Sequence, residues 1–167
     1  NVAVENGELK SNTVLQDTFN YCKQHNKPLH FIGLVSDGGV HSHIEHVKAL
    51  CTYAKEAGLP AGKVFVHAFT DGRDCDPKSG LGFLKDLDSH LTNNASGHIA
   101  SVCGRYYAMD RDKRWERVKL AYDLLTKGEG KKTTDIFKAV EESYADGVTD
   151  EFIKPIVRTN KDGMPYA

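Results

Sequence analysis

Short apolar runs along this chain alternate with longer segments in which apolar residues recur every three or four positions. The short runs are rich in Val, Ile and Phe and lack a clean alternation of polar and apolar residues. This pattern is typical of strands that are covered on both faces of a sheet. The sequence therefore predicts three buried strands, at residues 29–35, 63–69 and 98–102.

The segments between and after these runs have the periodicity of amphipathic helices. Helices are expected at residues 13–23, 44–57, 111–126 and 134–144. A further helix, third in chain order, is expected to start at residue 77 and to continue through the leucines that follow. The residues expected to face the core are Val14, Phe19 and Cys22 in the first helix, Ile44, Val47, Leu50, Cys51 and Ala54 in the second, Leu81, Leu84, Leu87 and Leu91 in the third, and Trp115, Val118, Tyr122 and Leu125 in the fourth.

Residues that start and stop helices mark the ends of these segments. Ser42, with Glu45 three positions later, predicts a capping box at the start of the second helix. Pro77 is expected in the first turn of the third helix. Gly128 and Gly147 lie close behind the fourth and fifth helices, where glycine commonly ends a helix.

Strands that alternate with helices of this length indicate βαβ units. We therefore expect an α/β fold with a mainly parallel sheet and helices on both of its faces, a three-layer α/β/α arrangement. Residues 1–167 are expected to form a single domain, since this length suits one ordinary core. The order of the strands in the sheet is left open.

The composition is that of an ordinary globular protein, with 40% hydrophobic and 27% charged residues. A formal net charge of -1 does not favour nucleic acid as a partner, because that would call for a broad positive surface. No apolar run is long enough to span a membrane, and no secretory signal pattern is present. The four cysteines form no CxxC pair, which favours a reduced, cytoplasmic protein.

The two ends of the sequence suggest a piece of a longer protein. The chain starts at Asn1 without a methionine, and it stops soon after the turn signal Asp162-Gly163. A turn of this kind normally leads into another element. We therefore expect that a functional site could be only partly contained in this chain.

Each predicted strand runs into a loop that carries charged residues and glycine, and each loop runs into a helix. The loops are residues 36–43, 70–74 and 103–111. The carboxyl ends of parallel strands lie at one edge of a sheet, where open α/β sheets bind their ligands. The residues expected to meet there in one cleft are Asp37, His41, Arg73, Asp74, Arg105 and Arg111.

The residue types in this cleft suit a small anionic ligand that has a hydroxyl group. Guanidinium groups grip phosphate and carboxylate oxygens in two-point fashion. Gly38-Gly39 allows close backbone approach, and the start of the next helix favours phosphate. Asp74 could take or give a proton on a substrate hydroxyl, and His41 could do the same or donate to a phosphate.

Several of these residues have a simpler explanation. Arg114 and Arg117 have Asp110 and Asp112 nearby at helical spacing, so they are better explained as exposed ion pairs than as ligands. Arg105 and Arg111 could also be ion-pair residues rather than ligands. Asp37 and Asp71 are best explained as turn or cap residues.

The histidines and the glycines give no further site. His43 and His46 could face one metal ion from a helix, but no carboxylate or cysteine in the right register completes a site, so no metal is expected in this chain. His67 lies within a predicted strand and is interpreted as a hydrogen-bonded core histidine. Neither GxGxxG nor GxxxxGK[ST] occurs, so nucleotide binding is not supported.

Three segments together resemble a known family. They are LVSDGGVHSH at residues 34–43, HAFTDGRD at 67–74 and SVCGRYYAMDRDKRWERV at 101–118. In this order and spacing they resemble the 2,3-bisphosphoglycerate-independent phosphoglycerate mutases, and the resemblance runs from about residue 9 to residue 167. The longest of the three segments is chemically unusual, which makes the match specific.

The resemblance implies a two-domain enzyme that interconverts 3-phosphoglycerate and 2-phosphoglycerate through a phosphoserine. One domain resembles alkaline phosphatase and holds the serine and two divalent metal ions, usually manganese. This chain resembles the other domain, which is inserted in the first and binds the glycerate. The enzymes of the family are commonly monomers.

Matched by position, the family's substrate contacts fall on His41, Arg73, Asp74, Arg105 and Arg111, with Asp74 as the proton shuttle. The nucleophilic serine, the metal ligands and a further arginine pair of the family have no counterpart in this sequence, so we expect the chain alone to be inactive. The alternatives are a free-standing module that binds phosphorylated metabolites and a domain of a related phosphomutase with another substrate.

Overall fold

The computed structural model describes residues 2–167 and contains a five-stranded sheet in the order β1-β2-β3-β5-β4. The strands are β1 (Leu29–Leu34), β2 (Val64–Thr70), β3 (His98–Gly104), β4 (Lys131–Thr133) and β5 (Ile156–Arg158). β1, β2 and β3 are mutually parallel, as are β4 and β5, but β5 runs antiparallel to β3. The three predicted strands are confirmed, and the prediction missed β4 and β5, which are too short to show a hydrophobic pattern.

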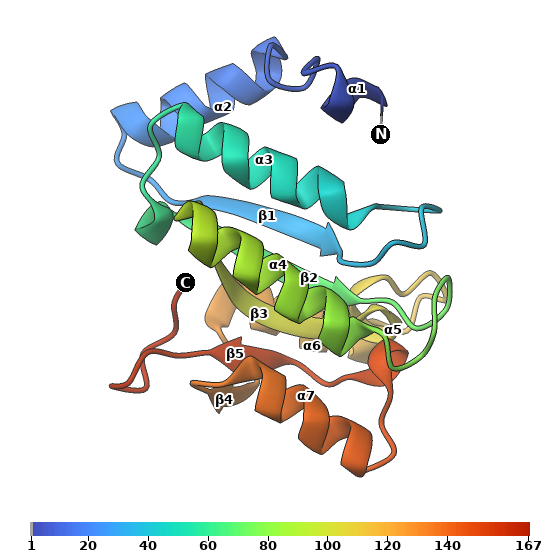
Figure 1. Cartoon of the computed structure of the whole chain (residues 1–167). Coiled ribbons are helices and arrows are strands. Elements are labelled where there is room, and N and C mark those ends of the chain that lie inside the picture. Colours follow the sequence, from blue (N-terminus) through green and yellow to red (C-terminus); the bar gives the residue numbers. More distant parts are fainter. Residues whose placement is uncertain (1) are drawn as a thin grey trace.

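The helices cover most of the remaining chain (Figure 1). They are α1 (Val2–Glu5), α2 (Thr13–Gln24), α3 (Ile44–Glu56), α4 (Gly80–Asn94), α5 (Arg105–Ala108), α6 (Trp115–Lys127) and α7 (Ile136–Ala145), with 3-10 turns η1 (Ala61–Lys63) and η2 (Asp150–Phe152). All five predicted helices are present. The third and fourth begin later than predicted, at Gly80 and Trp115, because turns occupy the residues between.

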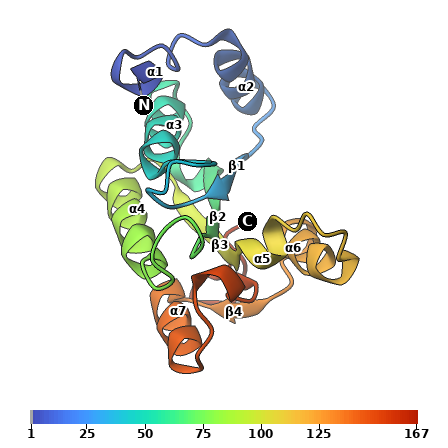
Figure 2. The ribbon, with the colours of Figure 1, turned by 90° about the vertical axis from the view of Figure 1, so that its right-hand side faces the viewer.

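Helices lie on both faces of the sheet, as predicted. Figure 2 shows α3, α4 and α7 on one face and α5 and α6 on the other. The larger core lies under the first group and includes Phe19, Ile44, Leu84, Ile99 and Val140. The smaller core lies under α6 and consists of Leu34, Phe69, Cys103, Ala121, Leu124 and Val157. The fold is therefore the predicted α/β class.

Two predicted core faces are wrong in part. Trp115 and Tyr122 were expected to face the core from α6, but their side chains are 70% and 60% exposed. Ala121 and Leu124 are buried instead, since the small alanine side chain lets the helix lie against the sheet while the aromatic residues tolerate the surface. In α2, Val14 is also exposed, and Leu15 packs against the core.

The predicted capping box at the start of α3 does not form. His43, rather than Ser42, is the N-cap residue, and its Nδ1 accepts a hydrogen bond from the backbone N–H of Glu45 at 3.3 Å. The Glu45 side chain pairs with Lys48 at 2.8 Å instead of reaching back to the cap. The His43 side chain satisfies one N–H group of this helix end, and the N–H groups of Ile44 and His46 donate to the carbonyls of Ser36 at 2.8 Å and His43 at 2.9 Å.

A chain of polar side chains crosses the sheet on the α6 face. His67 Nδ1 lies 2.7 Å from Ser101 Oγ, and His67 Nε2 lies 3.0 Å from His30 Nδ1. His67 is buried, and this burial lowers the pKa of its imidazole to about 4, with the neighbouring His30 acting in the same direction. The interpretation of His67 as a hydrogen-bonded core histidine is confirmed.

We expect the neutral state of His67 to make stability depend on pH. The unfolded chain takes up a proton near pH 6.5, whereas the folded chain resists it down to about pH 4. The contribution of neutral His67 to the free energy of unfolding is therefore fully present above pH 6.5. It is lost as the pH falls from 6.5 to about 4, by up to about 3 kcal/mol. Urea unfolding at pH 7 and pH 5 measures the loss.

The substitution His67→Gln keeps hydrogen-bonding capacity but removes the titration, so the difference between the two pH values should shrink. His25→Gln, at an exposed position, is the matched control and should leave the difference unchanged. An equal loss of stability in His67→Gln and in the unsubstituted chain would contradict the assignment.

Candidate functional site

Three loops meet at one edge of the sheet. They follow β1, β2 and β3, whose parallel register places their carboxyl ends together at the right of Figure 1. The loop after β2 turns at Gly72, where φ is +67°. The loop after β3 begins with the short helix α5, which starts at Arg105. The order of strands along the chain therefore fixes which loops form the site.

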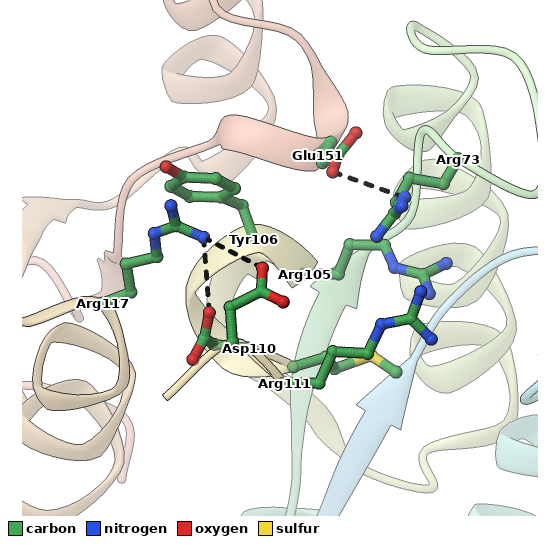
Figure 3. A pocket seen from close by; sticks show the side chains of 9 residues that line it. Arg73, Arg105, Tyr106, Asp110, Arg111, Arg117 and Glu151 are labelled. Carbon is green, nitrogen blue, oxygen red and sulfur yellow. Dashed lines mark hydrogen bonds and ion pairs between the residues drawn. The ribbon is translucent and has the colours of Figure 1, made fainter. Parts of the chain in front are cut away.

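Two neighbouring cavities open between these loops. The first has a volume of about 390 Å³ and is lined by His41, Arg73, Asp74, Arg105, Met109 and Arg111. The second, of about 400 Å³, shares Arg73, Arg105, Met109 and Arg111 and adds residues that include Tyr106, Asp110, Arg117 and Glu151 (Figure 3). The structure thus brings together all the residues predicted for the cleft except Asp37, which is exposed and lines neither cavity.

A buried ion cluster holds the three loops together. Arg105 Nη1 donates to Asp71 Oδ1 at 2.6 Å and to Asp74 Oδ2 at 2.7 Å. The hydroxyl of Ser36, from the loop after β1, donates to Asp71 Oδ2 at 2.7 Å. The side chains of Arg105 and Asp71 are only 9% and 2% exposed. The cluster therefore takes one group from the loop after β1, two from the loop after β2 and one from the segment after β3.

Asp71 has a larger role than the predicted turn residue. It does close the turn, since its Oδ1 accepts the backbone N–H groups of Arg73 at 3.2 Å and Asp74 at 3.1 Å. Burial disfavours its charged form, but hydrogen bonds from Ser36 and Arg105 outweigh burial and hold its pKa below the ordinary value. In the sequence, the position of Asp71 directly after the apolar run of β2, whose residues are all buried, indicates this role.

Asp74 faces the first cavity between two cationic groups. Its side chain is 24% exposed, and its Oδ2 contacts Arg105 and lies 3.9 Å from His41 Nε2. Among the residues that the structure describes, Oδ1 of Asp74 has no hydrogen-bond or ion-pair partner. One oxygen of this carboxylate is therefore held by the protein while the other can reach a ligand.

The remaining arginines of the cleft differ in how they are held. Arg111 makes no hydrogen bond and no ion pair with any residue in the described range 2–167. Arg73 is half exposed and forms an ion pair with Glu151, whose Oε1 lies 3.6 Å from Arg73 Nε (Figure 3). Both guanidinium groups therefore have donors to offer to an anion.

The ion pairs predicted for Arg114 and Arg117 form only in part. Arg117 pairs with both Asp110 and Asp112, the latter at 3.9 Å, but not within one helix. α6 begins only at Trp115, so Asp110 lies in the loop before it. Arg117 Nη1 lies 3.3 Å from Asp110 Oδ1, and its guanidinium lies 3.9 Å from the centre of the Tyr106 ring. Asp110 also accepts the backbone N–H of Arg114 at 2.9 Å, while the Arg114 side chain forms no ion pair within the described chain. The contacts of Asp110 and Arg117 order the loop that carries Arg111.

Metal-binding side chains do not cluster anywhere in the described residues. No group of three or more His, Cys, Asp or Glu side chains among them could hold a metal ion. The rings of His43 and His46 lie 5.9 Å apart, with His43 occupied as the N-cap of α3. Within the same residues, no helix is both long enough and apolar enough to cross a membrane.

Comparison with known proteins identifies the family. The family model described as BPG-independent PGAM N-terminus (iPGM_N) matches residues 1–167. The chain belongs to this family. A 2,3-bisphosphoglycerate-independent phosphoglycerate mutase of Parabacteroides distasonis is 56% identical over 167 residues, which is 100% of this chain and 32% of the relative. An enzyme of the same name from Lawsonia intracellularis is 55% identical over 159 residues, or 95% and 31% of the two chains.

A solved structure supports the same relation. The crystal structure of Leishmania mexicana phosphoglycerate mutase at low cobalt concentration superposes with a TM-score of 0.85 at 29% identity, covering 98% of this chain and 31% of that chain. The resemblance inferred from the sequence is therefore confirmed at the level of family and fold. The chain spans about a third of the length of the curated relatives it matches.

Asp71→Asn tests whether the ion cluster holds the site together. The substitution removes the charge to which Arg105 and Ser36 donate, while Arg105 keeps its bond to Asp74, so we expect the free energy of unfolding to fall by about 2 kcal/mol. Asp37→Asn, at an exposed position outside the cavities, is the control and should change it by less than about 0.5 kcal/mol. Urea unfolding measures both, and equal stability of the two variants would show that the cluster does not stabilise the fold.

Proposed function

We propose that this chain is the phosphotransferase, or glycerate-binding, domain of a 2,3-bisphosphoglycerate-independent phosphoglycerate mutase. In the complete protein it would take part in the interconversion of 3-phosphoglycerate and 2-phosphoglycerate. The observation that carries the proposal is the cavity in which Asp74 lies between Arg105 and His41, beside Arg111, which has no hydrogen-bond or ion-pair partner among residues 2–167. The family membership of the chain makes this substrate the first choice.

Asp74 is proposed as the group that moves protons on the glycerate hydroxyls. An attacking hydroxyl must lose its proton as it accepts the phosphoryl group, and the hydroxyl from which phosphate departs must regain one. A carboxylate within hydrogen-bond reach can do both in turn. Arg105 donates to Oδ2 of Asp74 at 2.7 Å, and Oδ1 would remain free to contact the substrate.

The arginines are proposed to hold the two anionic ends of the substrate. Arg73 and Arg111 line the same cavity as Asp74 and carry guanidinium donors that are open to solvent. Such groups bind carboxylate and phosphate oxygens in pairs, which fixes both the position and the orientation of the ligand. His41, 3.9 Å from Asp74, is proposed as a further donor to the substrate.

The rest of the chemistry is assigned to a phosphatase-like domain of the same polypeptide. That domain would supply the phosphorylated serine and the divalent ions, manganese by resemblance to the family. We place the protein in the cytoplasm because its four cysteines are free thiols, and we expect a monomer. The described residues of this chain would bind and orient the glycerate and move its protons.

An NMR titration with 3-phosphoglycerate tests the binding role. We expect chemical-shift changes that cluster at His41, Arg73, Asp74, Arg105 and Arg111 and that exceed those caused by inorganic phosphate or sulfate. Arg111→Gln should weaken binding at least about tenfold, since one charged hydrogen-bonding group is lost. Lys132→Gln, on the exposed strand β4, is the control. Equal responses to phosphate and 3-phosphoglycerate would overturn the assignment of substrate.

A second experiment concerns turnover. This chain by itself is expected to give no mutase and no phosphatase activity, because the proposed serine and metal ligands belong to the other domain. An assay coupled to enolase, with added manganese, measures the conversion of 3-phosphoglycerate. Substantial activity of the highly purified chain would show that the catalytic groups lie within it and would refute the division of roles between two domains.

A further inference from the structure

The 3-10 turn η2 (Asp150–Phe152) enters the site from a distant part of the chain. Its residue Glu151 lies beside the cleft, across from Arg73 (Figure 3). Thr70, the last residue of β2, donates its hydroxyl to the carbonyl of Asp150 at 2.6 Å. Gly104, the last residue of β3, donates its N–H to the carbonyl of Ile153 at 2.7 Å. The turn is therefore attached to both strands from which the cleft loops leave.

Two glycines make room for the backbone of Glu151 between these strands. A Cβ atom on Gly72 would lie 2.8 Å from the backbone N of Glu151, and one on Gly104 would lie 2.3 Å from its carbonyl oxygen. Both distances are too short for any side chain. The backbone of Glu151 is thus packed tightly between the loop that carries Arg73 and the start of α5.

Asp150 anchors the same turn from its other side. Its side chain is fully buried and accepts the N–H of Gly80 at 2.7 Å and the hydroxyl of Tyr144. Its own N–H donates to the carbonyl of Pro77 at 2.9 Å. These contacts fix the position from which the side chain of Glu151 extends toward the cavities.

The carboxylate of Glu151 meets one edge of the Arg73 guanidinium. Its Oε1 lies 3.6 Å from Arg73 Nε, an ion pair that is too long for a hydrogen bond. The Glu151 side chain is 21% exposed, whereas that of Arg73 is 50% exposed. No other ion pair or hydrogen bond of the Arg73 guanidinium occurs among the described residues, so its two terminal nitrogens remain available in the cavities that it lines.

We propose that Glu151 is a positioning residue that holds the Arg73 guanidinium over the cleft in the absence of ligand. Identifying the ligand as phosphoglycerate rests on the function proposed above, but the positioning does not. A long, half-exposed arginine without this contact samples many rotamers and loses that freedom when it binds an anion. A rigidly held carboxylate at its Nε removes part of this loss in advance and leaves the terminal nitrogens for the anion.

Glu151→Gln tests the proposal directly, since it removes the charge and keeps the backbone packing. The matched control is Glu141→Gln on α7, because Glu141 Oε1 forms an ion pair of similar length, 3.5 Å, with Lys85 Nζ away from the cleft. Heteronuclear NMR relaxation of the Arg73 Nε–H group is measured without ligand, and Arg73→Lys assigns the signal. We expect Nε–H to be ordered in the unsubstituted chain and in Glu141→Gln, and mobile in Glu151→Gln. Equal order in all three would overturn the positioning role.

Ligand titration provides the second measurement. Glu151→Gln should weaken 3-phosphoglycerate binding by about three- to fivefold, the range of an exposed ion pair. In the Arg73→Gln background the same substitution should have no further effect, because the group that it positions is gone. Undiminished weakening in that background would show that Glu151 acts on binding by another route.

The two proposals can fail separately. If the unsubstituted chain binds 3-phosphoglycerate no better than inorganic phosphate, the proposed function fails, while relaxation of Arg73 Nε–H still decides the role of Glu151. If binding is specific and Arg73 keeps the same order in Glu151→Gln, the positioning proposal fails and the proposed function stands. Thermal unfolding of each variant confirms that the fold is retained.

Discussion

The buried contact of Arg105 with Asp71 and Asp74 is the interaction on which the site depends. Taking such charges out of water is costly, and the cost is recovered only when nearly every lone pair and proton has a partner. Here Ser36 and two backbone N–H groups complete the coordination of Asp71. Because the partners come from three different loops, the cluster is satisfied only when all three loops are in place. The cleft therefore forms between three loops that come together to pair the buried charges of Asp71 and Arg105.

This arrangement divides the arginines by task. Arg105 is largely buried and already committed to two carboxylates, so it orients Asp74. Arg111 has no partner within the described chain, and Arg73 is held only at its Nε by Glu151. The donors that remain open thus lie beside the one free oxygen of Asp74. Such a site can hold anionic groups and act on a hydroxyl without first breaking its own ion cluster.

The sequence predicts the edge of the sheet where the site forms, because parallel strands and their loops follow from local apolar patterns. Contacts that join distant segments are not predictable in this way. Asp150 reaches Gly80 and Thr70 across 70 and 80 residues, and no local pattern announces it. Glu151 was missed for the same reason. The exposed Trp115 is a different case. The apolar periodicity shows that α6 is amphipathic, but it does not show which of its apolar residues face the sheet.

The missed residues also explain why the glycines matter. Gly72 and Gly104 could be assigned to turns from the sequence alone, but their neighbour in space is the backbone of Glu151. A turn needs only one permissive residue, whereas here one glycine in the loop after β2 and another at the end of β3 both face the backbone of Glu151, which indicates that this backbone must approach closely. The close approach brings an acidic side chain beside Arg73, and this places a fixed negative charge at the inner edge of a cationic cleft. In the proposed role of Glu151, packing at the edge of the sheet, rather than the loop's own sequence, would set where Arg73 points.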